Sequence, residues 1–150
     1  MTEGQGKCSV VWFKRDLRLR DHAPLTAALA SRHPVLMVYL FEPELMDQPD
    51  WSLRHGQFVY QSIKDLNRQL ADFGTSVLVA HQDALSFFQA LSKIVSITGL
   101  FSHQESGNRA SFDRDKHMAH WLKGQGIEWY EYPSNGVVRG LKGRMNWADL

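Results

Sequence analysis

The sequence predicts a single α/β domain in which a five-stranded parallel sheet lies between two layers of helices. Short apolar runs alternate with segments of helical period through residues 1–132, a pattern typical of βαβ units. The 150 residues fit one domain that is large enough to bury about two thirds of its unfolded surface. Right-handed crossovers then predict a three-layer, doubly wound, Rossmann-like sandwich with strand order 3-2-1-4-5 and the first strand at its centre.

Five short apolar runs are the expected strands, and each is separated from the next by a segment of helical period. They extend from Cys8 to Phe13, Val35 to Phe41, Ser76 to Ala80, Thr98 to His103 and Ile127 to Tyr132. Trp12 and Trp129 alternate with apolar residues inside the first and last runs. We therefore expect both rings in the core and Trp12 to be largely buried.

The first two helical segments have recognisable ends. The first opens near Asp21 and Pro24, because an acidic cap and an early proline both favour a helix start. The second has the clearest pattern, since apolar residues recur at steps of four and three and Gly74 follows as a stop. These residues are Val59, Ile63, Leu66, Leu70 and Phe73. Their stripe is expected to lie against the sheet.

Two further helices complete the alternation. Asp83 can cap the third, whose apolar residues are Leu85, Phe88, Leu91 and Val95. The fourth runs from about Ser111 to Lys123, ahead of Gly124-Gln125-Gly126.

The composition excludes several classes of protein. Seventeen Lys and Arg against 16 Asp and Glu give a net charge of +1, so no global attraction to DNA or to an anionic membrane is expected. The single cysteine, Cys8, excludes an internal disulfide. No apolar run approaches the roughly 20 residues that span a bilayer, and the first residues are polar. We therefore expect a cytoplasmic protein without a membrane partner.

The loop after the first strand is charged where a phosphate-binding loop would have glycines, and no glycine occurs between Val10 and Ala30. Its charges can neutralise one another by ion pairing and backbone hydrogen bonds. They are Lys14, Arg15, Arg18 and Arg20 against Asp16 and Asp21. For Asp16, Arg18 and Asp21 we favour a structural clamp that fastens the loop to the sheet. Lys14 and Arg15 come first after the strand and can face a ligand.

Ligands of an open parallel sheet collect at the carboxyl ends of the strands, where the strand order switches. This rule selects Lys14 and Arg15, Phe41 and Glu42, and His103 and Glu105. Phe41 can stack on an aromatic chromophore, and the two glutamates can accept hydrogen bonds from its ring N–H or hydroxyl groups. The alternative is that Phe41 belongs to the core and that both glutamates pair with nearby arginines.

Arg54 comes just before the second helix, where positive charge opposes the helix dipole. An anionic ligand group or Asp50 can be its partner, and the alternative is an exposed loop arginine. His117 and His120 are spaced i,i+3, but no carboxylate or thiolate triad accompanies them. We interpret them as a solvated helix face and expect no metal site. No nucleophile motif or paired carboxylates occur either, so we expect no catalysis by this chain alone.

Two regions of the chain carry a family resemblance. The run Val10-Val11-Trp12-Phe13-Lys14-Arg15-Asp16-Leu17-Arg18-Leu19-Arg20-Asp21 resembles the opening of DNA photolyases and cryptochromes, in which an aromatic residue and a basic-Asp-Leu-Arg-Leu-x-Asp sequence follow a strand. Ser102-His103-Gln104-Glu105-Ser106-Gly107-Asn108, Arg114-Asp115 and Asn135-Gly136-Val137-Val138-Arg139 resemble the region between the fourth strand and the linker of bacterial members. The resemblance covers essentially the whole chain.

The resemblance implies that residues 1–132 form the N-terminal antenna domain, which binds a light-harvesting pigment. The candidate pigment-binding residues are Lys14, Phe41, Glu42, Arg54 and Glu105. Residues 133–150 are expected to begin a linker toward a helical domain that holds FAD and UV-damaged DNA. The chain is then either an excised domain or a short protein, and we expect a monomer that meets DNA only through the helical domain. The family's tryptophan electron-transfer chain also lies in that domain.

The start of the fourth helix bears on which pigment the resemblance implies. Folate-binding members resemble one another in an Asn-Glu pair before the Arg-x-Arg-Asp of the fourth helix. This chain has Ala110-Ser111 before Phe112-Asp113-Arg114-Asp115, so the amide and the carboxylate that contact folate are missing. A deazaflavin, a flavin such as FMN, or no antenna pigment at all fits better than folate.

The leading hypothesis is the antenna domain of a blue-light-dependent deoxyribodipyrimidine photolyase. The pigment would pass its excitation to FAD, whose reduced excited state donates an electron that splits a pyrimidine dimer. The first alternative is a cryptochrome photoreceptor, because the residues that separate the two lie beyond Leu150. A stand-alone nucleotide-binding module is the alternative from another class. The missing glycine loop counts against it, and an ATP titration would discriminate.

Overall fold

The computed structural model describes residues 6–14, 16–47, 51–104 and 109–133. Within these ranges the five strands form one parallel sheet of order β3-β2-β1-β4-β5, which confirms the predicted topology and the central place of the first strand. The strands are β1 (Lys7–Phe13), β2 (Val35–Phe41), β3 (Leu78–His81), β4 (Ser96–His103) and β5 (Trp129–Tyr132). The helices are α1 (Ala23–Ala30), α2 (Pro43–Met46), α3 (Leu53–Leu70), the 3₁₀ turn η1 (Ala71–Phe73), α4 (Ala84–Leu91) and α5 (Arg109–Gln125).

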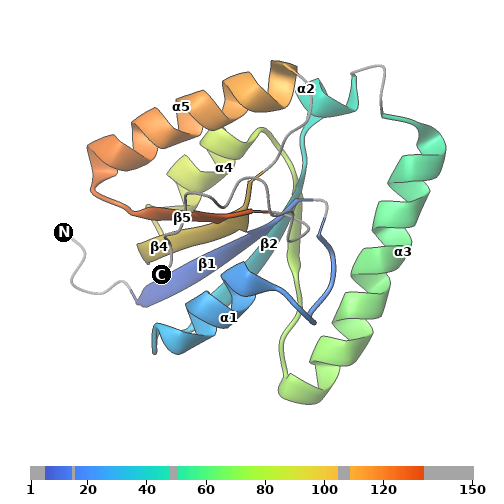
Figure 1. Cartoon of the computed structure of the whole chain (residues 1–150), viewed down its shortest axis with the longest axis horizontal. Coiled ribbons are helices and arrows are strands. Elements are labelled where there is room, and N and C mark those ends of the chain that lie inside the picture. Colours follow the sequence, from blue (N-terminus) through green and yellow to red (C-terminus); the bar gives the residue numbers. More distant parts are fainter. Residues whose placement is uncertain (1–5, 15, 48–50, 105–108, 134–150) are drawn as a thin grey trace.

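Helices cover both faces of the sheet, so the molecule has the predicted three layers (Figure 1). One core packs α4 and α5 against the sheet around Val10, Trp12 and Leu40. The other packs α1 and α3 against the opposite face around Val11 and Phe13. Trp12 is 1% exposed, as predicted, whereas Trp129 is only half-buried. Burying one large apolar side chain contributes about 1.5–3 kcal/mol, so the two cores fix the sheet firmly.

The stripe predicted for the second helix is largely confirmed. Val59, Ile63, Leu66 and Leu70 are buried on α3. Phe73, however, lies beyond α3 in η1 and is 77% exposed, so including it in the stripe was wrong. Gly74 ends this turn with φ +72, the left-handed conformation that glycine adopts at low cost.

The start of α1 differs from the prediction. The cap is His22, whose Nδ1 accepts a hydrogen bond from the Leu25 amide at 3.1 Å. Asp21, the predicted acidic cap, has φ +48 and belongs to the turn before the helix. The expected cap of α4 is confirmed, since Asp83 accepts from the Ser86 amide at 2.9 Å.

Two strands begin later than predicted because other groups use their backbone. The Val77 amide donates to the Asn67 side chain at 2.8 Å, so β3 begins at Leu78. The Ile127 amide donates to the Leu122 carbonyl at 3.0 Å, which closes the end of α5 and delays β5. The short helix α2 was not predicted.

No helix in the described part of the chain is long and apolar enough to cross a membrane. The expected linker lies outside the described residues from position 134 onward.

Candidate functional site

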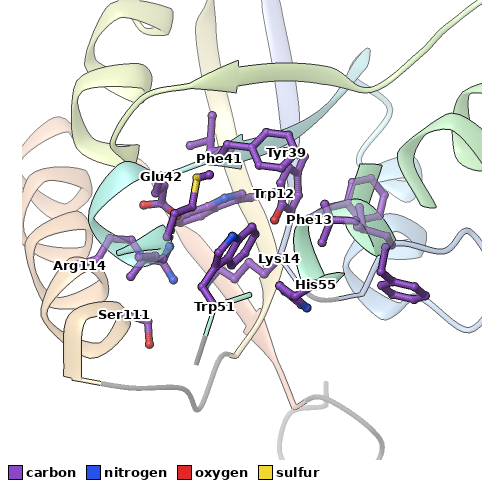
Figure 2. A pocket seen from close by; sticks show the side chains of 16 residues that line it. Trp12, Phe13, Lys14, Tyr39, Phe41, Glu42, Trp51, His55, Ser111 and Arg114 are labelled. Atoms are coloured by element: carbon purple, nitrogen blue, oxygen red, sulfur yellow. Dashed lines mark hydrogen bonds and ion pairs between the residues drawn. The ribbon is translucent and has the colours of Figure 1, made fainter. Parts of the chain in front are cut away.

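A cavity of about 170 Å³ lies where β1 and β2 end, the edge of the sheet at which parallel α/β domains bind ligands. Figure 2 shows its side chains, which come from the two strands, from the loops that follow them, from α2, α3 and α5, and from Trp51 just before α3. The residues that carry its chemistry are Trp12, Lys14, Phe41, Glu42, Trp51, His55, Ser111 and Arg114.

Aromatic rings make up much of the lining. Trp12 is almost fully buried, while Phe41 and Trp51 are half-buried. Trp51 meets His55 edge to face, with ring centroids 4.5 Å apart. The cavity therefore offers aromatic surface to a flat, apolar ligand.

Two cations and two carboxylates form a compact charged group beside Trp12. Arg114 donates to the buried Oε1 of Glu42, and its Nε donates to Asp115 Oδ1 at 2.7 Å. Lys14 Nζ lies 3.6 Å from the same Asp115 oxygen. Lys14 Nζ and the Arg114 guanidinium also lie 4.4 and 4.7 Å from the centre of the Trp12 ring. The cations are thus paired with carboxylates and also attracted to the ring.

Glu131 on β5 is a third carboxylate near this group. Its pKa is raised, mainly because the surrounding protein displaces water from the carboxylate. Attraction to Lys14 and Arg114 lowers the pKa, and repulsion from Asp115 raises it.

A second, separate cluster surrounds Asp16, which is 7% exposed. Its Oδ1 accepts from the Lys14 amide at 2.7 Å, and its Oδ2 lies 2.5 Å from His103 Nδ1 and 2.7 Å from His22 Nε2. Burial alone would raise the pKa of Asp16, but hydrogen bonds from both histidines and the amide outweigh it and hold this pKa well below its usual range.

The Asp16 cluster joins the end of β1, the start of α1 and the end of β4. The structural clamp predicted for Asp16, Arg18 and Asp21 is therefore confirmed for Asp16. Its partners are two histidines that the prediction had not placed there. Arg18 contributes differently, since its guanidinium donates to the carbonyls of Arg20 and Asp21 at 3.0 Å each.

Asp16, His22 and His103 also have the donor types of a metal site, with ligand atoms within 4.8 Å of one another. The cap of α1 argues against that use. His22 Nδ1 accepts the Leu25 amide, so the proton of the neutral ring is on Nε2, the atom beside Asp16. A metal bound to Nε2 would displace this proton, and the neutral ring would then carry its proton on Nδ1. That N–H would face the Leu25 N–H, and the hydrogen bond that caps α1 would be lost. The geometry therefore favours a hydrogen-bonded clamp.

The clamp predicts a specific response to acid. Because the folded state holds the pKa of Asp16 below its ordinary value of about 3.9, the carboxylate contributes stability that is fully present above that pH. As pH falls below about 4, the unfolded chain binds the proton first and the contribution is lost. We expect the free energy of unfolding in urea to fall more steeply between about pH 5 and pH 2 for the wild type than for Asp16→Asn. Equal slopes would contradict this prediction.

The structure places the five predicted binding residues differently. Lys14, Phe41 and Glu42 line the cavity. Arg54 is exposed and is not among the lining residues; it lies in the first turn of α3, not before it. Glu105 lies outside the described residues. Pigment binding by all five stays a prediction.

Other crevice candidates and the histidine pair can also be placed. His103 contacts Asp16 and does not line the cavity, while Arg15 lies outside the described residues. His117 and His120 are exposed, as expected for a solvated helix face.

Sequence reasoning did not select Trp51, His55, Ser111 or Arg114, which all line the cavity. Arg114 is separated from Glu42 by 72 positions, so no local pattern connects them. A glutamate directly after a buried strand does indicate a cationic partner, and this signal pointed to an arginine without identifying which one.

Comparisons with known proteins agree with this fold. A family model described as DNA photolyase matches residues 9–140. The chain is 25% identical over 148 residues to a chloroplastic/mitochondrial cryptochrome DASH of Oryza sativa subsp. japonica, covering 94% of the chain and 24% of the relative. It is 28% identical over 135 residues to a deoxyribodipyrimidine photo-lyase of Vibrio cholerae, covering 86% and 28%. The chain thus spans about a quarter of the length of these relatives.

Solved structures resemble it to a similar degree. A Synechocystis sp. PCC6803 cryptochrome has a TM-score of 0.75 at 26% identity, over 86% of this chain and 28% of that one. An archaeal photolyase from Sulfolobus tokodaii has a TM-score of 0.74 at 25% identity, over 85% and 29%. The latter is described as containing two FAD molecules, with the implication of a novel light-harvesting cofactor.

Proposed function

The chain belongs to the DNA photolyase family, and on that basis we propose that it is the light-harvesting antenna domain of a blue-light-dependent deoxyribodipyrimidine photolyase. A pigment in the cavity would absorb light and transfer its excitation to FAD. FAD and the damaged DNA would be held by the helical domain that the family resemblance implies.

The observation that carries this proposal is the aromatic and charged cavity at the carboxyl ends of β1 and β2. Phe41 and Trp51 provide stacking surface, and Glu42 and Lys14 provide polar groups for one edge of a ring. This chemistry suits a flavin or deazaflavin. Ser111 stands where folate-binding members carry glutamate, which supports a flavin-type pigment over folate.

Repair requires more than this chain supplies. Its net charge is +1, which offers little electrostatic attraction to DNA. We expect the 150-residue chain with added FAD to leave a thymine-dimer oligonucleotide unrepaired under blue light, and to bind DNA weakly at physiological salt. Measurable repair by the chain alone would contradict this division of labour.

A cryptochrome photoreceptor is the second candidate, favoured by the similarity to cryptochromes DASH of Oryza sativa, Gloeobacter violaceus and Solanum lycopersicum. The two functions predict different results for a protein that joins this chain to a flavin-binding helical domain. Light-dependent splitting of pyrimidine dimers supports the photolyase. Flavin photoreduction without dimer splitting supports the receptor.

Pigment binding itself can be tested by absorption titration. FMN or a deazaflavin is expected to bind with a red-shifted, structured spectrum, because burial against aromatic rings removes solvent broadening, and folate is expected to bind more weakly. Glu105→Ala is expected to raise the Kd about 5- to 150-fold by leaving ring donors unpaired. Glu128→Ala is the control, since Glu128 is exposed just before β5, at the opposite end of the sheet. Equal affinities of wild type and Glu105→Ala would remove Glu105 from the site.

A further inference from the structure

We infer that the cavity takes one end of the uncharged ring system of a flavin or deazaflavin and leaves any phosphate group outside. The inference rests on the proposed function, because it specifies which part of the pigment the domain recognises. Three features carry it: the size of the cavity, the pairing of its cations, and the charge balance between those cations and the carboxylates that they contact.

The size limits how much of a pigment can enter. The cavity measures about 170 Å³, close to the roughly 150 Å³ of an engineered apolar cavity that binds benzene. A space of this size accepts one end of a fused ring system. The rest of the ring system and the sugar-phosphate tail therefore extend beyond the described lining.

The cations of the cavity are already engaged. Proteins bind phosphate with cationic side chains or with amides at a helix N-terminus. Here Arg114 donates to both Glu42 and Asp115, and Lys14 lies 3.6 Å from Asp115. At the start of α3 the His55 amide donates to Ser52 Oγ at 3.0 Å. A phosphate would have to break one of these contacts to bind Arg114, Lys14 or the His55 amide.

The charge balance adds a second cost for phosphate. Lys14 and Arg114 are paired with two carboxylates, those of Glu42 and Asp115, so the charges of this group already balance. A phosphate dianion brought beside this group finds no net positive charge to offset the cost of removing water from the phosphate. An uncharged ring with N–H and carbonyl groups along one edge avoids that cost and still stacks on Phe41 and Trp51.

The test compares two ligands that share a ring and differ in phosphate. Riboflavin and FMN are titrated separately into the chain, and quenching of flavin fluorescence gives each Kd. Values within about threefold of each other, a difference of less than 1 kcal/mol, support the inference. FMN binding more than about tenfold tighter would overturn it while leaving the antenna proposal standing. Binding of neither flavin would overturn both.

A charge variant tests the physical cause. Asp115→Asn removes the carboxylate that Lys14 and Arg114 share, so FMN is expected to gain about a tenfold preference over riboflavin. Asp113→Asn is the matched control, because Asp113 is exposed on the same helix and pairs with Arg109 at 3.6 Å. An unchanged ligand preference in Asp115→Asn would overturn the inference. If circular dichroism shows that this variant is unfolded, Glu42→Gln provides the same comparison.

Discussion

Replacing Asp16 with alanine is expected to lower the free energy of unfolding by about 3 to 5 kcal/mol, a large part of the stability of a domain of this size. The carboxylate accepts from the Lys14 amide and lies within hydrogen-bonding distance of His22 and His103. Alanine removes the acceptor for all three groups, which are buried. The contacts that connect β1 with α1 and β4 through this carboxylate are then lost. Buried donors without acceptors are costly.

Urea unfolding followed by circular dichroism measures this loss. The control is Asp65→Ala, because Asp65 pairs with Arg68 at 2.7 Å on the exposed face of α3 and such pairs contribute about 0 to 1 kcal/mol. If Asp16→Ala prevents folding altogether, Asp16→Asn is measured instead, since it keeps the shape but turns one acceptor into a donor. A loss under about 1 kcal/mol in both variants would mean that water substitutes for the carboxylate.

The fold could be predicted because its signals are local. The apolar stripe of α3, the stop at Gly74 and the cap at Asp83 each depend on residues close together in the chain. Alternation of strands and helices, with right-handed crossovers, then leaves few possible topologies. The errors occurred where a distant or competing group determines the local structure. For example, the Asn67 side chain accepts a hydrogen bond from the Val77 amide, and β3 is shorter than predicted.

The site was less predictable because its contacts join distant segments. The rule for carboxyl ends of strands correctly brought Lys14, Phe41 and Glu42 to one cavity. It could not tell that His103 contacts Asp16, 87 positions away, and not the cavity. The partner of Glu42 depends on how α5 packs, which no short pattern records.

Replacing either Glu42 or Arg114 alone is expected to destabilise the protein strongly. Replacing both together is expected to cost less than the sum of the two single losses. Glu42 is 6% exposed and the Arg114 side chain 10%, so each single change leaves a poorly hydrated charge with one fewer partner. We expect Glu42→Gln and Arg114→Met each to lower the free energy of unfolding by about 2 to 4 kcal/mol. The range allows for the support that Asp115 still gives to Arg114.

The double variant is expected to lose about 2 kcal/mol less than the sum of the single losses, because no charge is then left with a missing partner. A double-mutant cycle in urea measures this coupling, and Asp65→Ala with Arg68→Ala is the matched exposed pair, for which a coupling below about 1 kcal/mol is expected. Similar coupling in both cycles would mean that water screens the cavity pair as well as it screens a surface pair. A strong coupling at Glu42 and Arg114 alone would show that the cavity cations are held by carboxylates, which is the condition under which a neutral ring is preferred to a phosphate.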